Sequence, residues 1–222
     1  MSYFPFFKEI EGEKCLVIGG GKVAARKISR LKEFGVKIKV VAPSIVSDIE
    51  AMAQACDNIS VERRIITPQD IENADFVIAA AGEEADKEAA RLCKERSIPV
   101  NVVDNQELCD FIFPSIIRKG DMVAGFVTGG KSPHVAAKIR RDCEMNISDN
   151  IEDILDYLAR IRKLAKDRIS DERKRAAYIR EVSEFCMKAD RVCSNKEENA
   201  FLQKYLDNRS ETVLPGAALV GA

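Results

Sequence analysis

The sequence predicts an α/β fold, in which a parallel, doubly wound sheet precedes a small β/α segment and a helical C-terminal region. Three observations predict it. Strand and helix signals alternate through the first hundred residues, a glycine-rich turn links the first strand to the first helix, and beyond residue 133 only helical periodicity remains. With 222 residues, the chain can build one large domain or two small ones.

The elements of the sheet region follow one another in a βαβα rhythm. Gly35 stops the first helix, Pro43 ends the second strand, and Ser44 is the expected N-cap of the second helix. The run at 75–80 is continuously apolar, as in a strand that is buried on both faces. The predicted strands are 14–18, 36–41, 59–63, 75–80 and 99–103, and the predicted helices are 22–34, 45–55 and 84–96.

The pattern changes after residue 110. Two β-like runs, 111–118 and 122–128, are joined by a hairpin signal, Lys119-Gly120-Asp121. Ser132 is then the expected N-cap of a helix whose first residue is Pro133. From there to about residue 207 the sequence is charged and helical, with apolar residues at three-to-four spacing.

These signals divide the chain into four predicted parts. The connecting segment is of a βββ/α type, and its strands are too few to form a stable sheet alone, so we expect pairing with a second copy in a homodimer. The parts are a nucleotide-binding sheet domain at 1–112, a dimerisation segment at 113–148, a helical domain at 149–209 and a disordered tail at 210–222.

Composition excludes several classes of protein. A net charge of −1 argues against a general nucleic-acid or membrane-surface binder, and no apolar run approaches the roughly 20 residues that span a bilayer. The N-terminus lacks the basic region of a signal peptide. Seven scattered cysteines without a C-x-x-C pair indicate reduced thiols in the cytoplasm, and their spacings fit no metal site, so we predict no bound metal.

The glycine turn has the pattern G-x-G-x-x-A of dinucleotide-binding folds. Gly19 would permit the turn, Gly21 would let the backbone approach a pyrophosphate, and Ala24 would allow close helix packing, with Gly20 between them. A glycine turn that only packs closely, without a ligand, is the alternative. The small residues that end the fourth strand, among them Ala81, would leave room for a cofactor.

The acid that usually binds the adenosine ribose, about twenty residues further on, is missing. Residues 41–44 hold no carboxylate, and no arginine stands ready for a 2′-phosphate, although Lys39 lies near in the sequence. Backbone groups around Pro43 and the hydroxyl of Ser44 could bind the ribose instead. The residues alone therefore do not separate NAD from NADP.

Two further groups of residues could carry chemistry. Asp104 follows the fifth strand, beyond Asn101, at the edge of the sheet where the glycines lie, so its carboxylate is a candidate general base or, more simply, a turn cap. The loop from Thr128 to His134 offers amides, hydroxyls, Lys131 and a helix N-terminus to an anion. His134 is the only histidine, and a lone histidine is more often a surface or capping residue than a catalyst.

Taken together, these segments resemble the precorrin-2 dehydrogenases, the siroheme-synthase N-terminal modules, some of which are also sirohydrochlorin ferrochelatases. The resemblance is specific through about residue 145 and weaker over the helical part. The motifs that carry it are FPFF at 4–7, VIGGGKVAARK at 17–27, VVAP at 40–43, PVNVVD at 99–104, FPSII at 113–117 and TGGKSP at 128–133.

The resemblance implies a Rossmann-type domain, a dimerisation segment and a helical domain in a homodimer. It implies an oxidoreductase of siroheme (porphyrin) biosynthesis that oxidises precorrin-2 to sirohydrochlorin with NAD. Cofactor contacts then fall on Lys22, Val23, Pro43 and Ser44, and the family's key aspartate falls on Asp104.

On the substrate side, the family's serine of the chelatase region is Thr128 here, which keeps the hydroxyl. The substrate carries eight carboxylates, so basic residues are candidate partners. We expect Asn101, Thr128, Lys131, Ser132 and His134 to bind the substrate, with Arg118, Lys119 and Lys138 as further basic candidates.

Two alternatives remain beside the dehydrogenase. One is a chelatase that inserts iron or cobalt with little dehydrogenase activity, against which the intact glycine turn argues. The other is a non-catalytic protein that senses NAD or delivers a tetrapyrrole, against which Asp104 and the complete loop at 128–133 argue. Between one function and two the sequence does not decide. Because the methyltransferase domain of some relatives is not in this chain, we expect precorrin-2 to come from a separate protein.

Overall fold

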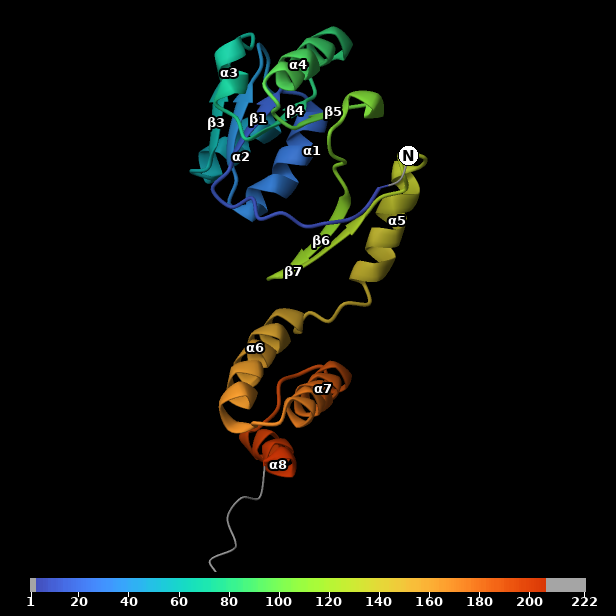
Figure 1. Cartoon of the computed structure of the whole chain (residues 1–222). Helices are drawn as coiled ribbons and strands as arrows, with labels where there is room; N and C mark the ends of the chain where they lie inside the picture. Colours follow the sequence, from blue (N-terminus) through green and yellow to red (C-terminus); the bar gives the residue numbers. More distant parts are fainter. Residues whose placement is uncertain (1–2, 207–222) are drawn as a thin grey trace, which may run out of the picture. The chain divides into compact units, whose positions relative to one another are not determined.

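The computed structural model describes residues 3–206, and their contacts group into two compact units (Figure 1). The first unit comprises the chain up to Pro114 together with Val127–Pro133. The second comprises Ser115–Phe126 and the chain from His134 onward. Each unit is described by itself.

The first unit contains a five-stranded parallel sheet in the order β3-β2-β1-β4-β5. The predicted doubly wound sheet is confirmed, with strand ends that differ from the prediction by up to a residue or two. The strands are β1 (Lys14–Ile18), β2 (Lys37–Val41), β3 (Ile59–Glu62), β4 (Phe76–Ala79) and β5 (Val100–Val102). The helices are α1 (Lys22–Leu31), α2 (Ser47–Ala55), α3 (Pro68–Glu72) and α4 (Glu83–Glu95), with 3-10 turns η1 (Lys32–Phe34) and η2 (Gln106–Leu108).

The strand order places a topological switch point between β1 and β4. From β1 the chain winds outward to β2 and β3, then crosses back to β4 and β5 on the other side. In open parallel sheets a ligand binds in the crevice beyond the carboxyl ends of the strands at such a point. The turns that follow β1, β2, β4 and β5 therefore meet at one edge of the sheet.

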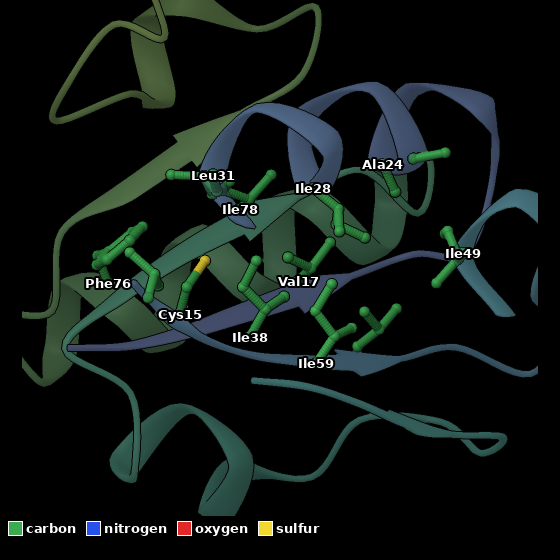
Figure 2. Close-up of a cluster of buried hydrophobic side chains, with 13 residues drawn as sticks. Cys15, Val17, Ala24, Ile28, Leu31, Ile38, Ile49, Ile59, Phe76 and Ile78 are labelled. Carbon is green, nitrogen blue, oxygen red and sulfur yellow. The ribbon is translucent and has the colours of Figure 1, made fainter. Parts of the chain in front are cut away.

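Helices cover both faces of the sheet, which explains the continuous apolar character of its strands. On one face, Ala24, Ile28 and Leu31 of α1 pack against alternate residues of the central strands (Figure 2). Residues of α3 and α4 pack against the intervening positions on the other face. Every residue of β4 is buried, as expected for a strand with no solvent-facing side.

One local expectation was wrong, and one short helix was not predicted. Ser44 does not cap α2, which begins three residues later with Val46 at its N-cap. The reason is tertiary: the Val46 amide donates to the carbonyl of Gly20 at 2.9 Å, so this loop packs against the glycine turn. The short helix α3 was missed, although Pro68 at its first turn and the capping box of Thr67 and Asp70 are signals for it.

The second unit combines a β-hairpin with helices. Strands β6 (Ser115–Lys119) and β7 (Met122–Phe126) pair antiparallel, with Lys119 opposite Met122 and Gly120 at a φ of +56° in the turn. The predicted hairpin is confirmed, but the described residues of this unit form two strands rather than three. The helices are α5 (Pro133–Glu144), α6 (Ile151–Arg168), α7 (Glu172–Ala189) and α8 (Asn195–Tyr205).

Pro133 is the first residue of α5, as predicted, and between β7 and Leu206 every regular element is helical. A buried cluster that includes Ile154, Ile161, Tyr178 and Val182 holds α6, α7 and α8 together. The predicted disordered tail at 210–222 lies outside the described residues. Among the described helices, none is long and apolar enough to cross a membrane.

Candidate functional site

The three consecutive glycines after β1 serve different physical purposes. Gly19 has a φ of +114°, and a Cβ there would lie 2.2 Å from the carbonyl oxygen of Ala80. A Cβ on Gly20 would lie 2.1 Å from the carbonyl oxygen of Ser44. At Gly21 a Cβ would meet nothing within 4 Å. The first two glycines thus let the turn touch the chain after β4 and β2, whereas the third borders open space.

That open space lies at the N-terminus of α1. Gly21 is the N-cap in an extended conformation, no side chain caps the helix, and its first turn contains no acidic residue. Lys22 adds an exposed positive charge. Free amides at the positive end of a helix dipole bind anions. The turn and its helix could therefore hold the pyrophosphate of a dinucleotide, which is the role that the motif predicts.

The N-terminus of α4 also follows a glycine at the same edge, but it is already neutralised. The buried Asp86 carboxylate accepts hydrogen bonds from the amides of Ala81 at 2.8 Å and Gly82 at 3.3 Å. Burial raises the pKa of Asp86, and these two hydrogen bonds oppose the rise. Glu83 and Glu84 add negative charge to the same turn. Of these two helix N-termini, only that of α1 is open to an anion.

Asp86 was not identified from the sequence. Its signal was an acidic residue in the first turn of a helix whose N-cap, Gly82, has no side chain. Ala81, which we predicted to line the cofactor site, is exposed, and its amide is engaged by Asp86. A cofactor could therefore contact the small side chain of Ala81 but not bind its amide.

The loop after β2 carries Pro43 and Ser44, both exposed, and no carboxylate follows the strand. Lys39, which lay near in the sequence, is not directed to a phosphate. Its ammonium pairs with Glu62 and Asp70, each at 3.0 Å. The neighbouring guanidinium of Arg64 also binds Asp70, at 2.7 Å.

Asp104 lies just beyond β5 at the same sheet edge, exposed and at a φ of +59°. A non-glycine residue in this region of φ is uncommon and is often held by its surroundings for a functional reason. Within residues 3–206, no hydrogen bond or ion pair engages the Asp104 carboxylate, so it does not act as a turn cap. Its charge acts on both Asp86 and Lys27.

The loop at 128–132 is closed by hydrogen bonds of its own threonine and packs against Gln106. The Thr128 hydroxyl donates to the Ser132 carbonyl at 2.9 Å and accepts from the Ser132 amide at 3.2 Å. Gly130 packs so closely on the Gln106 side chain that a Cβ would lie 2.0 Å from its Oε1 atom. Gln106 is two residues beyond Asp104, so the first unit brings this loop against the segment that follows the aspartate. Lys131 is exposed there.

Most of the other substrate candidates belong to the second unit. His134 is exposed and groups with that unit. Lys119 donates to the Ile147 carbonyl and pairs with Asp149 at 2.7 Å. Lys138 pairs with Asp142 at 2.7 Å, and Arg118 donates to the Gly120 carbonyl at 3.3 Å. These basic groups already have partners within their own unit.

Asn101, which we expect from the sequence to bind the substrate, has a buried side chain. This side chain accepts from the Lys27 ammonium at 2.8 Å and donates to the Phe111 carbonyl at 2.9 Å. These contacts make it a support for the site from within. Lys27 was not singled out from the sequence. Its signal was a lysine inside the apolar stripe of α1, one residue before Ile28.

The geometry defines a class: a doubly wound domain whose first helix presents an open N-terminus to a dinucleotide. In agreement, residues 6–115 match a family described as putative NAD(P)-binding. The chain is 34% identical over 227 residues to the siroheme synthase of Thioalkalivibrio sulfidiphilus and 32% identical over 224 residues to that of Methylobacillus flagellatus. The whole chain is thus similar to part of each of these siroheme synthases.

These alignments cover 100% of the chain but 46% and 48% of the two relatives, so the chain spans about half the length of the curated relatives it matches. A solved structure of SirC, precorrin-2 dehydrogenase, superposes with a TM-score of 0.68 at 20% identity. That superposition covers 91% of this chain and 98% of SirC, which shows a shared fold. The Rossmann-type sheet with a helical C-terminal region is therefore confirmed.

Proposed function

We propose that this chain is an NAD-dependent precorrin-2 dehydrogenase, which oxidises precorrin-2 to sirohydrochlorin in siroheme biosynthesis. One observation carries the proposal: the open N-terminus of α1 and the exposed carboxylate of Asp104 lie at the same edge of one sheet. The names of the relatives support it, since siroheme synthases match the whole chain and SirC shares its fold.

In this proposal the dinucleotide binds across the switch point. The glycine turn and the amides of Lys22 and Val23 hold the pyrophosphate, while Pro43 and Ser44 border the adenosine ribose and Ala81 leaves room beside β4. NAD is favoured over NADP because the cations near the ends of β2 and β3 are already paired. Lys39 and Arg64 bind Asp70, and Arg63 binds Glu50.

The reaction removes one hydride and one proton from the substrate. The glycine turn, Lys22 and Val23 would hold NAD there, and the bound cofactor would supply the hydride acceptor. The Asp104 carboxylate, exposed and free of hydrogen-bond partners within the described chain, takes the proton or orients the macrocycle. The loop with Thr128, Lys131 and Ser132 packs against Gln106, two residues beyond Asp104, and is proposed to bind substrate carboxylates, with His134 as a further candidate.

A second candidate activity is insertion of iron into the product. It is favoured by the name of the relatives, siroheme synthase, because siroheme contains the inserted metal. Within residues 3–206, no cluster of three or more histidine, cysteine or acidic side chains could hold a metal ion. Iron would then be a substrate that binds the macrocycle directly, with Asp104 as the nearby carboxylate.

The seven free thiols favour a cytoplasmic protein.

The decisive experiment is an anaerobic assay of the purified chain with precorrin-2 generated in situ, in which NAD is compared with NADP. We expect NADH formation matched by the spectrum of sirohydrochlorin. Asp104→Ala should lower kcat by about 100-fold, a typical contribution of an acid–base group, with the Kd for NAD unchanged. A wild-type chain that binds NAD yet forms no NADH would contradict the dehydrogenase and favour a chelatase or an NAD sensor.

A homodimer is the proposed assembly. Helix α5 buries only Ala136, and Ile139 and the neighbouring Met145 are 43% and 78% exposed in the single chain. A two-stranded sheet is also marginal by itself. A second copy of the chain that covers these surfaces would bury the exposed apolar residues of and beside α5 and one side of the β6–β7 sheet.

A further inference from the structure

The strongest unassigned feature of the first unit is the partly buried ammonium of Lys27. It projects from α1 toward β5, where its Nζ atom donates to Asn101 Oδ1 at 2.8 Å. The same Nζ atom lies 4.3 Å from the centre of the Phe113 ring, a cation–π contact. A buried charge is costly unless it is compensated, so a lysine here calls for a function that a methionine or leucine would not provide.

Asn101 carries the contact onward to the chain that leaves the sheet. Its Nδ2 atom donates to the Phe111 carbonyl at 2.9 Å and lies 3.6 Å from the thiol of Cys109. One asparagine side chain therefore joins α1, β5 and the segment at 109–111. Of these three parts, β5 and the segment at 109–111 are the two ends of the stretch of chain that carries Asp104.

The side chain of Cys109 connects the end of this stretch of chain back to its beginning. Its sulfur accepts from the Val102 amide at 3.1 Å and faces the carbonyls of Val102 and Asn105, at 3.2 and 3.3 Å, to one of which the thiol hydrogen is donated. Asn105 directly follows Asp104. Burial raises the pKa of Cys109, which keeps the sulfur protonated and able to donate. The thiol thus links the residues on either side of Asp104, and we call this set of contacts the Cys109 clamp.

We propose that Lys27 is a positioning residue for Asp104, acting through Asn101 and the Cys109 clamp to hold the turn that presents the carboxylate. The inference rests on the proposed function, because it assigns Lys27 to the same site. Lys27 itself touches neither the cofactor turn nor the carboxylate in a hydrogen bond. It acts by ordering the strand end that carries Asp104.

The electrostatics of this arrangement provide a second readout. Burial lowers the pKa of Lys27 to about 8, with the neighbouring charge of Arg26 also lowering it and that of Asp104 raising it. The thiols of Cys109 and Cys15 also lie close, and burial raises the pKa of each, which keeps them neutral. A charged ammonium binds Asn101 Oδ1 more strongly than a neutral amine does. As the pH rises through about 8, the tie should loosen, so kcat should decline on the alkaline side.

The test uses the whole chain with Lys27→Met, Lys27→Arg and Asn101→Leu, assayed for NADH formation and NAD binding. We expect Lys27→Met to lower kcat at least tenfold, with the Kd for NAD changed less than twofold and the alkaline decline near pH 8 lost. Lys27→Arg should restore most of kcat and move the decline to higher pH. The double variant Lys27→Met/Asn101→Leu should be no worse than the poorer single variant, since both residues act through one contact.

Controls separate this proposal from simple destabilisation and from the proposed function itself. Arg30→Met, at an exposed position of the same helix, should leave kcat and its pH profile unchanged. A Lys27→Met chain that is folded and retains wild-type kcat, in a series where Asp104→Ala is inactive, would overturn the positioning role alone. If Asp104→Ala retained full activity, the catalytic assignment would fail first. Thermal melting of each variant shows that the folded enzyme is being compared.

Discussion

At the scale of single residues, Gly20 and Gly21 are neighbours in one turn, yet substitutions at them should differ. A Cβ at Gly20 would lie 2.1 Å from the Ser44 carbonyl oxygen, whereas one at Gly21 would meet nothing within 4 Å. Gly20→Ala should therefore lower the free energy of unfolding by about 2 kcal/mol, as overpacking does. Gly21→Ala should keep the stability and weaken NAD binding about tenfold, because the methyl group enters the space proposed for the pyrophosphate.

Chemical denaturation and isothermal titration with NAD measure the two effects. The two alanines serve as matched controls for each other, since they differ by one position in the same turn. Tight NAD binding by the Gly21→Ala chain would show that the pyrophosphate does not lie beside this residue.

The glycine turn and Asp104 were identified at this scale from the sequence, because strand, turn and helix signals are local. Asp86, Lys27 and Cys109 were not. A carboxylate, an ammonium and a thiol acquire their roles here from partners that only folding supplies. Lys27, for example, meets Asn101 across 74 positions of sequence.

At the scale of elements, the short helix α3 depends on one carboxylate. Asp70 accepts from the amide and hydroxyl of Thr67 at 2.8 and 2.9 Å, and it binds Arg64 and Lys39. The Arg64 guanidinium is the largest cause that holds the pKa of Asp70 well below its usual range. These contacts tie α3 to β2 and to the chain after β3.

The lowered pKa of Asp70 predicts how the stability of the chain depends on pH. Because the folded-state pKa of Asp70 is lower than that of the unfolded chain, its stabilisation is present above about pH 4 and is lost as the pH falls below that value. Asp70→Asn should lower the free energy of unfolding by about 2 kcal/mol at pH 7, the scale of hydrogen bonds to a charged group. The difference from wild type should shrink toward pH 3.

Urea unfolding at pH 7, 5, 4 and 3 measures this difference. Asp48→Asn on α2 is the control, and its stability should follow that of the wild type at each pH. A deficit of Asp70→Asn that stayed constant down to pH 3 would show that Asp70 contributes through packing rather than through its charge.

The order of elements was predictable because hydrophobic period, glycine and proline act over short stretches of chain. The start of α2 was not. Ser44 has the side chain of an N-cap, but the Gly20 carbonyl accepts from the Val46 amide instead, and the helix begins beyond it. A contact between two loops thus overrides a local preference.

At the scale of the whole molecule, the exposed side of α5 is the proposed interface of a homodimer. Ile139→Asp should place a charge in that interface and convert a dimer into a monomer, with the fold of the single chain preserved. Light scattering coupled to size exclusion measures the mass. Ile65→Asp, at an apolar residue 74% exposed in the first unit, is the matched control and should not change the mass. A monomeric wild-type chain would contradict the proposal.

The sequence by itself determined the class of the fold, the glycine turn after the first strand, and the position of Asp104 at the end of a strand. These follow from patterns that repeat over a few residues and from the rule that parallel strands end at one edge. Only the tertiary structure decided which charged groups remain free there. Asp86 neutralises the N-terminus of α4 while that of α1 stays open, Lys39 pairs with Asp70 across 31 positions, and the partly buried Lys27 binds Asn101 across 74 positions. The physical reason is that the state of a charge depends on its neighbours in space, and folding brings those neighbours from distant parts of the chain.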